Sequence, residues 1–313
     1  MNILVTGANG QLGKCIRDKV KSLKETENTY IYSDVVGSDD ADTEYLDIVD
    51  EEMVKNFVKN SHINVIINCA AYTNVDKAEN DYEDAEALNA IAPRNLAEAA
   101  LSVGAKLIQI STDYVFNGQT FFPYNEERMT LPTSVYGKTK AMGEEFIQQS
   151  GCKYLIFRTA WLYSEYGNNF VKTMLRLFNE KGELNVVNDQ IGTPTYAGNL
   201  ADLIVNIVEC MKPLEGKETI PLLENGIYHF TDEGVASWYD FAEYVHECWM
   251  HIIRGFVNIK GVTTKEYGSK TKRPFYSVLD KTKYKTDFKG LYEPKHWHYG
   301  VQKVVEELLN NRQ

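Results

Sequence analysis

Hydrophobic residues occur along the first half of the chain in two alternating patterns. Short, nearly continuous apolar runs are typical of strands buried on both faces, whereas apolar residues three and four apart are typical of helices with one buried face. These patterns predict strands over 3–5, 28–34, 64–72, 106–112 and 153–161, and helices over 51–60, 85–104 and 136–149. Because strands that alternate with helices form βαβ units, the sequence predicts the α/β class with a Rossmann-type doubly wound parallel sheet.

The pattern becomes less regular beyond Trp161, where Tyr, Trp and Asn are frequent. We therefore predict a dinucleotide-binding Rossmann domain over 1–160 and a smaller, mainly substrate-binding lobe over 161–313. The apolar segment 199–211 is expected to form a helix that packs back on the first domain, and 301–309 is expected to form the last helix. A group of aromatic residues with mostly helical spacing is interpreted as core: Trp238, Tyr239, Phe241, Tyr244 and Trp249.

The segment GANGQLG, residues 7–13, follows the first predicted strand and precedes an amphipathic helix. In a dinucleotide fold Gly7 would permit the tight turn, Gly10 would let the backbone approach a pyrophosphate, and Gly13 would let the helix pack close to the strand. The helix N-terminus would then present unpaired N–H groups to the phosphates. The GxxGxxG spacing is a weak signal alone, but its place between a strand and a helix predicts a nucleotide site.

Asp34 lies at the end of the second predicted strand. A carboxylate at this place accepts hydrogen bonds from the adenosine ribose and repels a 2′-phosphate. Between Lys24 and Lys55 the sequence contains no lysine or arginine that could hold such a phosphate. The residues therefore predict that NADH serves at least as well as NADPH.

Tyr136 and Lys140, in YGKTK, are four residues apart and so share a face of the predicted helix. A phenol has an unperturbed pKa of about 10, and a nearby ammonium favours the phenolate, so Lys140 is expected to lower the pKa of Tyr136. Taken alone, the spacing describes an exposed helical pair. Because it follows a dinucleotide turn and a polar strand end, it predicts a proton-transferring pair, whose lysine could also bind the nicotinamide ribose.

The polar strand end is ISTDYVF, where Ser111, Thr112 and Asp113 leave the predicted sheet. Parallel sheets bind ligands at the carboxyl ends of their strands. A hydroxyl there could stabilise a substrate oxygen as hydride arrives, and Asp113 could orient a sugar hydroxyl. The alternative is an ordinary Ser/Thr/Asp turn.

Composition excludes several other classes of protein. The net charge of −11 makes a nucleic-acid surface unexpected. No stretch reaches the roughly 18 apolar residues of a membrane span, and no signal peptide is evident, so we expect a cytoplasmic protein. Five scattered cysteines and two histidine pairs lack the spacing of a disulfide framework or a metal site, and we expect neither.

These motifs resemble the extended short-chain dehydrogenase/reductase superfamily and, more narrowly, the dTDP-4-dehydrorhamnose reductases, which carry out the last step of dTDP-L-rhamnose synthesis. GANGQLG and YGKTK mark only the superfamily, whereas the combination of STDYVF with RTAWLY, GNNF and NDQIGTPT is more specific. The resemblance covers nearly the whole chain, in these segments: GANGQLG, CAAYTNVDKAE, LNAIAPRNLA, STDYVF, VYGKTKAMGE, FRTAWLY, GNNFVKTML, NDQIGTPT and KRP at 272–274.

The resemblance implies reduction of the 4-keto group of dTDP-4-dehydro-β-L-rhamnose by NADH or NADPH, in a monomer or homodimer that binds neither nucleic acid nor membrane. Tyr136 would protonate the 4-keto oxygen, with Lys140 tuning it and Thr112 as hydroxyl partner beside Asp113. Trp161 would form a flat wall for sugar or base, or else be a core aromatic, and Arg273 would clamp the diphosphate, or else be a surface cation. Further cofactor contacts are implied at Gln11, Leu12, Asp47, Ile48, Ala71, Tyr72 and Thr73.

Two positions depart from the family pattern. Some members are metal-bridged dimers through acidic residues, one of them just after the glycine turn, but here that place is Cys15, so no metal is carried over. The clamp reads Lys272-Arg273 where two arginines are usual. Two alternatives remain: a nucleotide-sugar 4-epimerase or dehydratase with tightly bound NAD, and a non-catalytic subunit similar to the regulatory subunit of methionine adenosyltransferase. The latter type lacks the RTAW and NDQ-G-P stretches that this chain contains.

Overall fold

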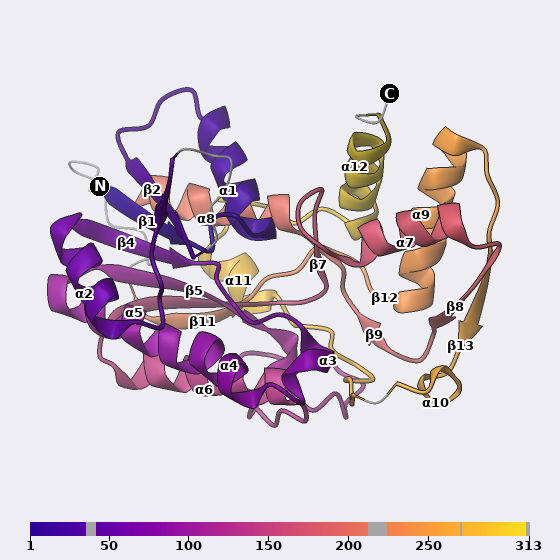
Figure 1. Cartoon of the computed structure of the whole chain (residues 1–313), viewed down its shortest axis with the longest axis horizontal. Coiled ribbons are helices and arrows are strands. Elements are labelled where there is room, and N and C mark those ends of the chain that lie inside the picture. Colours follow the sequence, from indigo (N-terminus) through magenta and orange to yellow (C-terminus); the bar gives the residue numbers. More distant parts are fainter. Residues whose placement is uncertain (36–41, 212–223, 270, 311–313) are drawn as a thin grey trace.

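A computed structural model describes residues 1–35, 42–211, 224–269 and 271–310, and divides them between a sheet lobe and a smaller lobe (Figure 1). Within the described residues the main sheet has seven strands, paired in parallel in the order β11-β6-β5-β4-β1-β2-β3. The strands are β1 (Asn2–Thr6), β2 (Thr29–Asp34), β3 (Thr43–Tyr45), β4 (Ile63–Asn68), β5 (Lys106–Thr112), β6 (Lys153–Thr159) and β11 (Gly226–His229). This confirms the predicted doubly wound parallel sheet.

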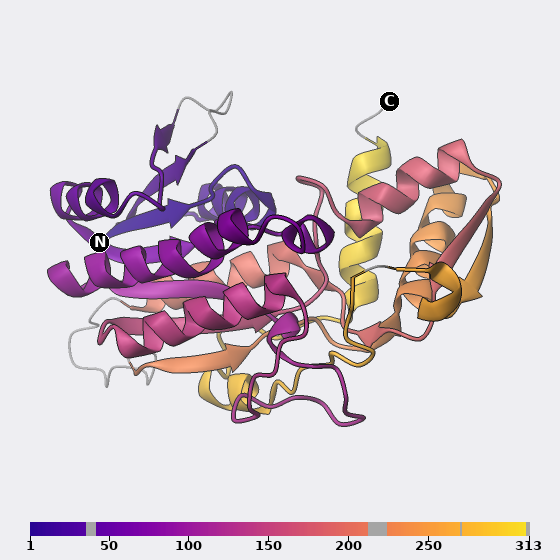
Figure 2. The same ribbon diagram turned by 60° about the horizontal axis from the view of Figure 1, so that its bottom comes forward.

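Helices cover both faces of this sheet, as the turned view makes plain (Figure 2). On one face, α1 (Gln11–Ser22), α8 (Ala197–Cys210) and α11 (Thr282–Asp287) form a core with Ile3 and Val5 of β1. On the other face, α2 (Glu51–Asn60), α5 (Ala92–Val103) and α6 (Val135–Gln149) form a second core that includes Leu4. Successive residues of a strand point to opposite faces, so a strand buried on both sides requires the continuous apolar run seen in the sequence.

The predicted helix over 85–104 is interrupted. It begins as α4 (Tyr82–Glu86), passes through a π-helical turn (Ala87–Ile91) and continues as α5. Pro93 lacks the N–H that would bond four residues back, and this favours the wider turn. The turn contains Asn89, whose amide binds the backbone of Tyr72 and the hydroxyl of Thr139. The short helix α3 (Val75–Ala78) lies between β4 and α4.

The smaller lobe has its own core. Its elements are α7 (Phe170–Glu180), β8 (Glu183–Val187), α9 (Trp238–Ile253), β13 (Asn258–Val262), α10 (Thr264–Tyr267) and α12 (Trp297–Asn310), together with the two-residue strands β7 (Leu162–Tyr163), β9 (Ile191–Gly192), β10 (Thr195–Tyr196) and β12 (Ala236–Ser237). Phe241 of α9 and Val301 of α12 are fully buried in this core. In Figure 1 this lobe stands beside the carboxyl ends of the sheet strands.

Three late elements, α8, β11 and α11, return to the sheet lobe. Helix α8 packs against α1, as the sequence predicts. Strand β11, which the sequence analysis does not predict, pairs with β6. The described helices include none long and apolar enough to cross a membrane.

Candidate active site

Helix α6 places Tyr136 and Lys140 at the carboxyl edge of the sheet. Ser134 caps the helix, because its Oγ accepts the Gly137 N–H at 3.1 Å. A Cβ added at Gly137 would lie 2.2 Å from the carbonyl oxygen of Tyr114, so only glycine lets the first turn rest directly on that residue. The rings of Tyr114 and Tyr136 consequently meet edge to face, with centroids 5.5 Å apart.

Strand β5 delivers Thr112 and Asp113 to the same place. Thr112 ends the strand and its Oγ1 accepts the N–H of Tyr114, which starts a short 3₁₀ turn over Asp113–Val115. The same hydroxyl donates to Asp113 Oδ1 at 3.0 Å and lies close enough to Tyr136 to affect its pKa. The structure therefore brings together the strand end and the helical pair, two motifs separated in sequence.

Tyr136 keeps its proton at neutral pH. The residue is partly exposed, but its hydroxyl lies among buried groups, and burial raises its pKa to about 12. The nearby Thr112 hydroxyl lowers the pKa of Tyr136, whereas the negative charge of Asp113 adds to the increase. The prediction that Lys140 lowers this pKa toward neutrality is wrong, because burial dominates. A protonated phenol is suited to donate a proton rather than to accept one.

Lys140 is held by the strand beneath it. Its Nζ donates to the carbonyl oxygen of Ile110 at 2.7 Å, and only 4% of the residue is exposed. Burial lowers the pKa of Lys140 to about 8, while Glu144 and Cys69 favour the charged form. Its charge is therefore sensitive to its neighbours near neutral pH.

Asp113 is a buried carboxyl group whose Oδ1 accepts a hydrogen bond from the Thr112 hydroxyl. Burial raises its pKa to about 6, although the hydroxyls of Ser277 and Thr112 favour the ionised form. Ser111 differs from its two neighbours. Its Oγ donates to Glu144 Oε1 at 2.5 Å, beneath α6, so it does not share the edge with Thr112.

The glycine turn follows β1 and lies at the same carboxyl edge of the sheet, two strands away from β5. Gly7 has φ +64°, and a Cβ there would lie 2.5 Å from the backbone nitrogen of Ala70, so the turn needs glycine on both counts. Gly10 is the N-cap of α1, and Gly13 lies within its first turn. Asp34, at the end of β2, accepts the Asn9 N–H at 3.0 Å. The predicted ribose carboxylate thus lies beside the turn.

The other implied cofactor residues flank this turn. Asp47 accepts the Val49 N–H, and the side chain of Ile48 is buried in the core. Tyr72 is fixed by Asn89 and by a bond from its hydroxyl to Asp81 at 2.8 Å. Residues Ala71, Tyr72 and Thr73 follow β4, whose neighbour in the sheet is β1.

Gln11 makes contacts that the sequence does not suggest. Its Oε1 accepts from Asn169 Nδ2 at 3.0 Å and from Ser164 Oγ at 3.2 Å. Its side chain thus joins the glycine turn to the loop that leads into α7. Leu12 is buried in the sheet core, which leaves its backbone for any cofactor contact.

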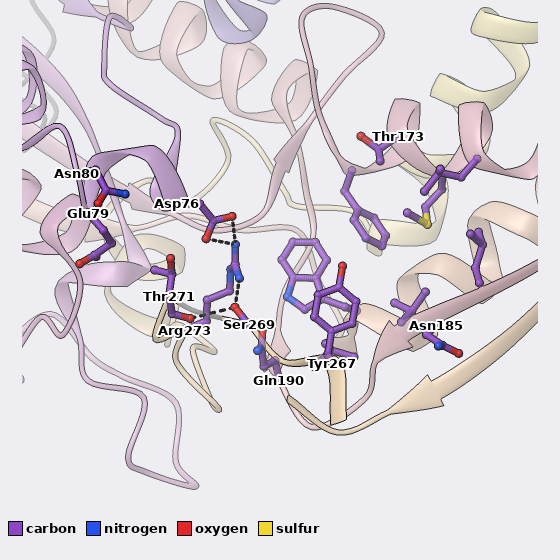
Figure 3. Close-up of a pocket in the computed structure, with 17 residues that line it drawn as sticks. Asp76, Glu79, Asn80, Thr173, Asn185, Gln190, Tyr267, Ser269, Thr271 and Arg273 are labelled. Atoms are coloured by element: carbon purple, nitrogen blue, oxygen red, sulfur yellow. Dashed lines mark hydrogen bonds and ion pairs between the residues drawn. The ribbon is translucent and has the colours of Figure 1, made fainter. Parts of the chain in front are cut away.

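A groove of about 880 Å³ runs between the lobes (Figure 3). Its apolar wall is formed by α7 and β8 together with Trp238. Its polar wall consists of Asp76, Glu79, Asn80, Ser269, Thr271 and Arg273. Arg273 crosses the groove, because its Nη2 binds both carboxylate oxygens of Asp76 at 2.8 and 2.9 Å and its Nη1 donates to Ser269. The positive charge of Arg273 also acts on Tyr114, the residue that packs on Tyr136, and favours the ionised form of that phenol.

Trp161 lies behind this groove rather than in its lining. It has a φ of +48°, which is unusual for a residue with a side chain, and strain of this kind is often found near functional sites. Its ring stacks on Trp238 with centroids 3.6 Å apart. Trp238 itself lines the groove, so it presents the aromatic surface that the sequence analysis assigns to Trp161.

The interpretation of the 238–249 aromatics as core is correct for Phe241 and Trp249, which are buried, whereas Trp238 is partly buried against the same core and also lines the groove. Trp238 follows the capping residue Ser237 and is the first residue of α9. A residue in the first turn of a helix can face outward whatever its periodicity, so spacing alone could not identify it. Phe170, in GNNF, also begins a helix and also lines the groove.

Nothing in the described residues forms a metal site, since no three His, Cys, Asp or Glu side chains cluster there. The five cysteines are free thiols, and Cys15 is buried.

The sheet, the glycine turn and the Tyr-Lys helix together define a Rossmann-type oxidoreductase of the extended short-chain dehydrogenase/reductase class. The chain belongs to the dTDP-4-dehydrorhamnose reductase family, since a family model described as "RmlD substrate binding domain" matches residues 1–310. A dTDP-4-dehydrorhamnose reductase from Aggregatibacter actinomycetemcomitans is 39% identical over 304 residues, which cover 96% of this chain and 97% of the relative.

Two solved structures are also similar over nearly their full length. A dTDP-4-dehydrorhamnose reductase from Clostridium acetobutylicum is 40% identical with a TM-score of 0.83, and the match covers 98% of this chain and 99% of that one. The enzyme from Bacillus anthracis, in complex with NADP, is 37% identical with a TM-score of 0.82, at the same coverage.

Proposed function

We propose that the protein reduces the 4-keto group of dTDP-4-dehydro-β-L-rhamnose with NADH or NADPH, giving dTDP-β-L-rhamnose. The observation that carries this proposal is the meeting of the Thr112 hydroxyl and Tyr136 at the carboxyl edge of the sheet, in a chain whose full-length relatives are named for this reaction. Two hydroxyl groups at the same place can both donate hydrogen bonds to the oxygen of one carbonyl group.

The glycine turn fits a dinucleotide. The close contact at Gly7 leaves room only for backbone, and Gly10, lacking a side chain, caps none of the N–H groups of α1. Those groups are therefore suited to a pyrophosphate, and Asp34 to the adenosine ribose. We propose that Lys140 and Tyr136 contact the nicotinamide ribose, and that the backbone near Leu12, Asp47, Ile48 and 71–73 completes the site. When bound, NAD(P)H supplies the hydride.

The protein residues handle the oxygen and its proton. In the proposed reaction Tyr136 donates its proton to the C4 oxygen as negative charge develops there, and Thr112 donates a hydrogen bond to the same oxygen. The raised pKa of Tyr136 keeps the proton available until the oxygen becomes basic. Asp113, next to both, is placed to accept from a neighbouring sugar hydroxyl.

The groove between the lobes suits the nucleotide part of the substrate. Arg273 has the planar donor geometry that matches diphosphate oxygens. Trp238, supported by Trp161, offers an aromatic surface for the sugar or base. We therefore propose that 161–313 mainly forms the substrate-binding lobe and 1–160 mainly the cofactor domain. We further propose a monomer or homodimer that acts in the cytoplasm.

The test measures oxidation of NADH and of NADPH at the nicotinamide absorbance, with dTDP-4-dehydro-β-L-rhamnose generated in place by its upstream enzymes. Cofactor consumption together with dTDP-rhamnose formation supports the proposal. A folded protein that binds nucleotide but consumes no cofactor contradicts it. Because of Asp34, NADH should be at least as effective as NADPH, and a hundredfold preference for NADPH would be inconsistent with this assignment.

Tyr136→Phe is the matched variant, because it removes one oxygen and keeps the ring that packs on Tyr114. We expect kcat to fall by about 10²–10⁴-fold, the usual contribution of a positioned acid, with nearly unchanged NADH affinity. Full activity in this variant would show that another group supplies the proton.

A nucleotide-sugar 4-epimerase makes a different prediction. Such an enzyme recycles its NAD and should be purified with it, whereas the proposed reductase exchanges cofactor at every turnover. The absorbance spectrum and extracted nucleotide of the purified protein distinguish the two.

A further inference from the structure

A buried charged cluster lies directly beneath the catalytic edge. Glu144 follows Lys140 by one helical turn on α6, and Arg158 of β6 binds it through two nitrogens, Nε to Oε1 at 2.9 Å and Nη2 to Oε2 at 2.6 Å. Both members of the pair are 3% exposed. Ser111, which pairs with Arg158 across the sheet, donates to the same carboxylate.

The cluster fixes α6 on β5 at two consecutive residues. Lys140 binds the carbonyl of Ile110, and Glu144 binds the hydroxyl of Ser111. The next residue along the strand is Thr112. Lys140 and Glu144 of α6 are thus hydrogen-bonded to the two residues of β5 that precede Thr112. These bonds fix the position of Tyr136 on α6 relative to Thr112 on β5.

The cluster contains more positive than negative charges. One carboxylate, Glu144, lies between two buried cations, Lys140 and Arg158. Arginine keeps its proton in proteins, whereas a buried lysine readily loses it. Of the two cations, only Lys140 can therefore respond to a change in the charge balance.

Other groups around Lys140 and Arg158 contribute little positive charge. Cys69 faces Lys140 from the segment after β4, and Asp113 lies near Tyr136 at the end of β5. His229 of β11 approaches Arg158, with Nε2 3.4 Å from Nη1 and Nδ1 3.0 Å from the carbonyl of Tyr124. Burial and the adjacent Arg158 lower the pKa of His229 to about 3, so it is neutral.

We propose that Glu144 and Arg158 are positioning residues of the reaction, which together set the charge of Lys140 and hold its helix in register with β5. Glu144 stabilises the protonated lysine, and Arg158 limits this effect by sharing the carboxylate. This inference rests on the proposed function, because it assigns Lys140 to the cofactor ribose and the proton-donating pair.

The geometry predicts opposite effects for the two partners. In Glu144→Gln two buried cations remain with no carboxylate between them, so Lys140 should lose its proton at lower pH. In Arg158→Met the carboxylate belongs to Lys140 alone, so the lysine should keep its proton to higher pH. Each shift should be about one pH unit. Ser111→Ala removes a hydrogen bond from the same carboxylate without changing any charge, and should shift the lysine by less than about a third of a unit.

The experiment follows NADH affinity by nucleotide fluorescence, and kcat/KM, from about pH 6 to pH 9.5 for the wild type and the three variants. Support requires that the alkaline limb of both profiles moves down in Glu144→Gln, up in Arg158→Met, and remains in place in Ser111→Ala. Equal losses at every pH with an unmoved limb would show a structural role only and overturn the proposal.

Two safeguards keep the test decisive. If a single variant does not fold, the double variant Glu144→Gln/Arg158→Met removes the ion pair as a unit, and its limb should lie between those expected for the two single variants. A limb outside that interval would contradict the charge assignment. Because the NADH profile needs no sugar substrate, it reports on the cluster even if the proposed reaction fails.

Discussion

Two carboxylate-guanidinium pairs in this molecule have similar geometry and very different surroundings. Arg158–Glu144 and Arg273–Asp76 both have a closest N–O distance below 3 Å, 2.6 Å in the first and 2.8 Å in the second. The first pair is 3% exposed on both sides, whereas Asp76 in the second is 62% exposed. Water can replace either partner of the exposed pair but neither partner of the buried one. The buried pair therefore fixes structure, and the exposed pair leaves Arg273 free to exchange Asp76 for a ligand anion.

The largest difference should appear in stability. Glu144→Ala leaves Arg158 charged in the core, and we expect the free energy of unfolding to fall by about 3–5 kcal/mol. Asp76→Ala, the matched control, should change it by less than about 1 kcal/mol. Urea denaturation followed by circular dichroism measures both. Similar losses in the two variants would remove the distinction between the pairs.

Asp113 extends the comparison to a buried carboxyl group that accepts a hydrogen bond from the Thr112 hydroxyl and has no cationic partner at that bond. Its folded pKa of about 6 exceeds 3.8, the ordinary value for an aspartate, so its stabilising contribution is complete below about pH 4 and is lost as pH rises through 6. The wild type should lose up to about 3 kcal/mol of stability relative to Asp113→Asn between pH 4 and pH 7. Denaturation curves at four or five pH values test this, and a constant difference would contradict the raised pKa.

Arg273 should matter for binding rather than folding. Loss of its charge-assisted contacts with a diphosphate should weaken binding of dTDP by about 10–100-fold, which corresponds to about 1.5–3 kcal/mol. Isothermal titration with dTDP compares Arg273→Ala with the wild type. Lys272→Ala serves as the control, since this neighbouring cation is exposed and does not line the groove. Equal effects in both variants would indicate general electrostatic attraction instead of a clamp.

The smallest expected effect is an increase in the affinity for dTDP. If Asp76 competes with the diphosphate for Arg273, Asp76→Asn should strengthen dTDP binding by about twofold to fivefold, in line with the small worth of an exposed pair. If Asp76 instead positions Arg273 for its ligand, the same variant should bind more weakly. The sign of the change, measured in the same titration, decides between competitor and support.

The sequence predicts the sheet lobe well for a physical reason. Its strands are buried on both faces and its helices on one, so hydrophobic spacing reports their structure directly, as at 51–60 and 106–112, where the predicted bounds match α2 and β5. The meeting of Thr112 with Tyr136 is also predictable, because parallel strands end at a common edge. The π-helical turn before Pro93 is a local departure that periodicity cannot reveal.

What the sequence does not predict depends on contacts between distant segments. The side chain of Gln11 turns toward 164–169, more than 150 residues away, and no local pattern encodes that contact. Trp238 reaches the groove only because α9 begins there. The pKa of Tyr136 depends on how deeply its hydroxyl is buried, and spacing from Lys140 carries no information about depth.

The return of β11 to the sheet has a consequence for how this protein can be made. A chain released at residue 160 would have six of the seven strands, but it would lack the edge strand β11 and the helices α8 and α11, which help to cover one face of the sheet. Leu203 of α8, Phe230 after β11 and Phe288 after α11 complete that core. During synthesis, the proposed cofactor domain must therefore wait for residues made near the end of translation. An excised nucleotide domain should aggregate unless these segments are supplied with it.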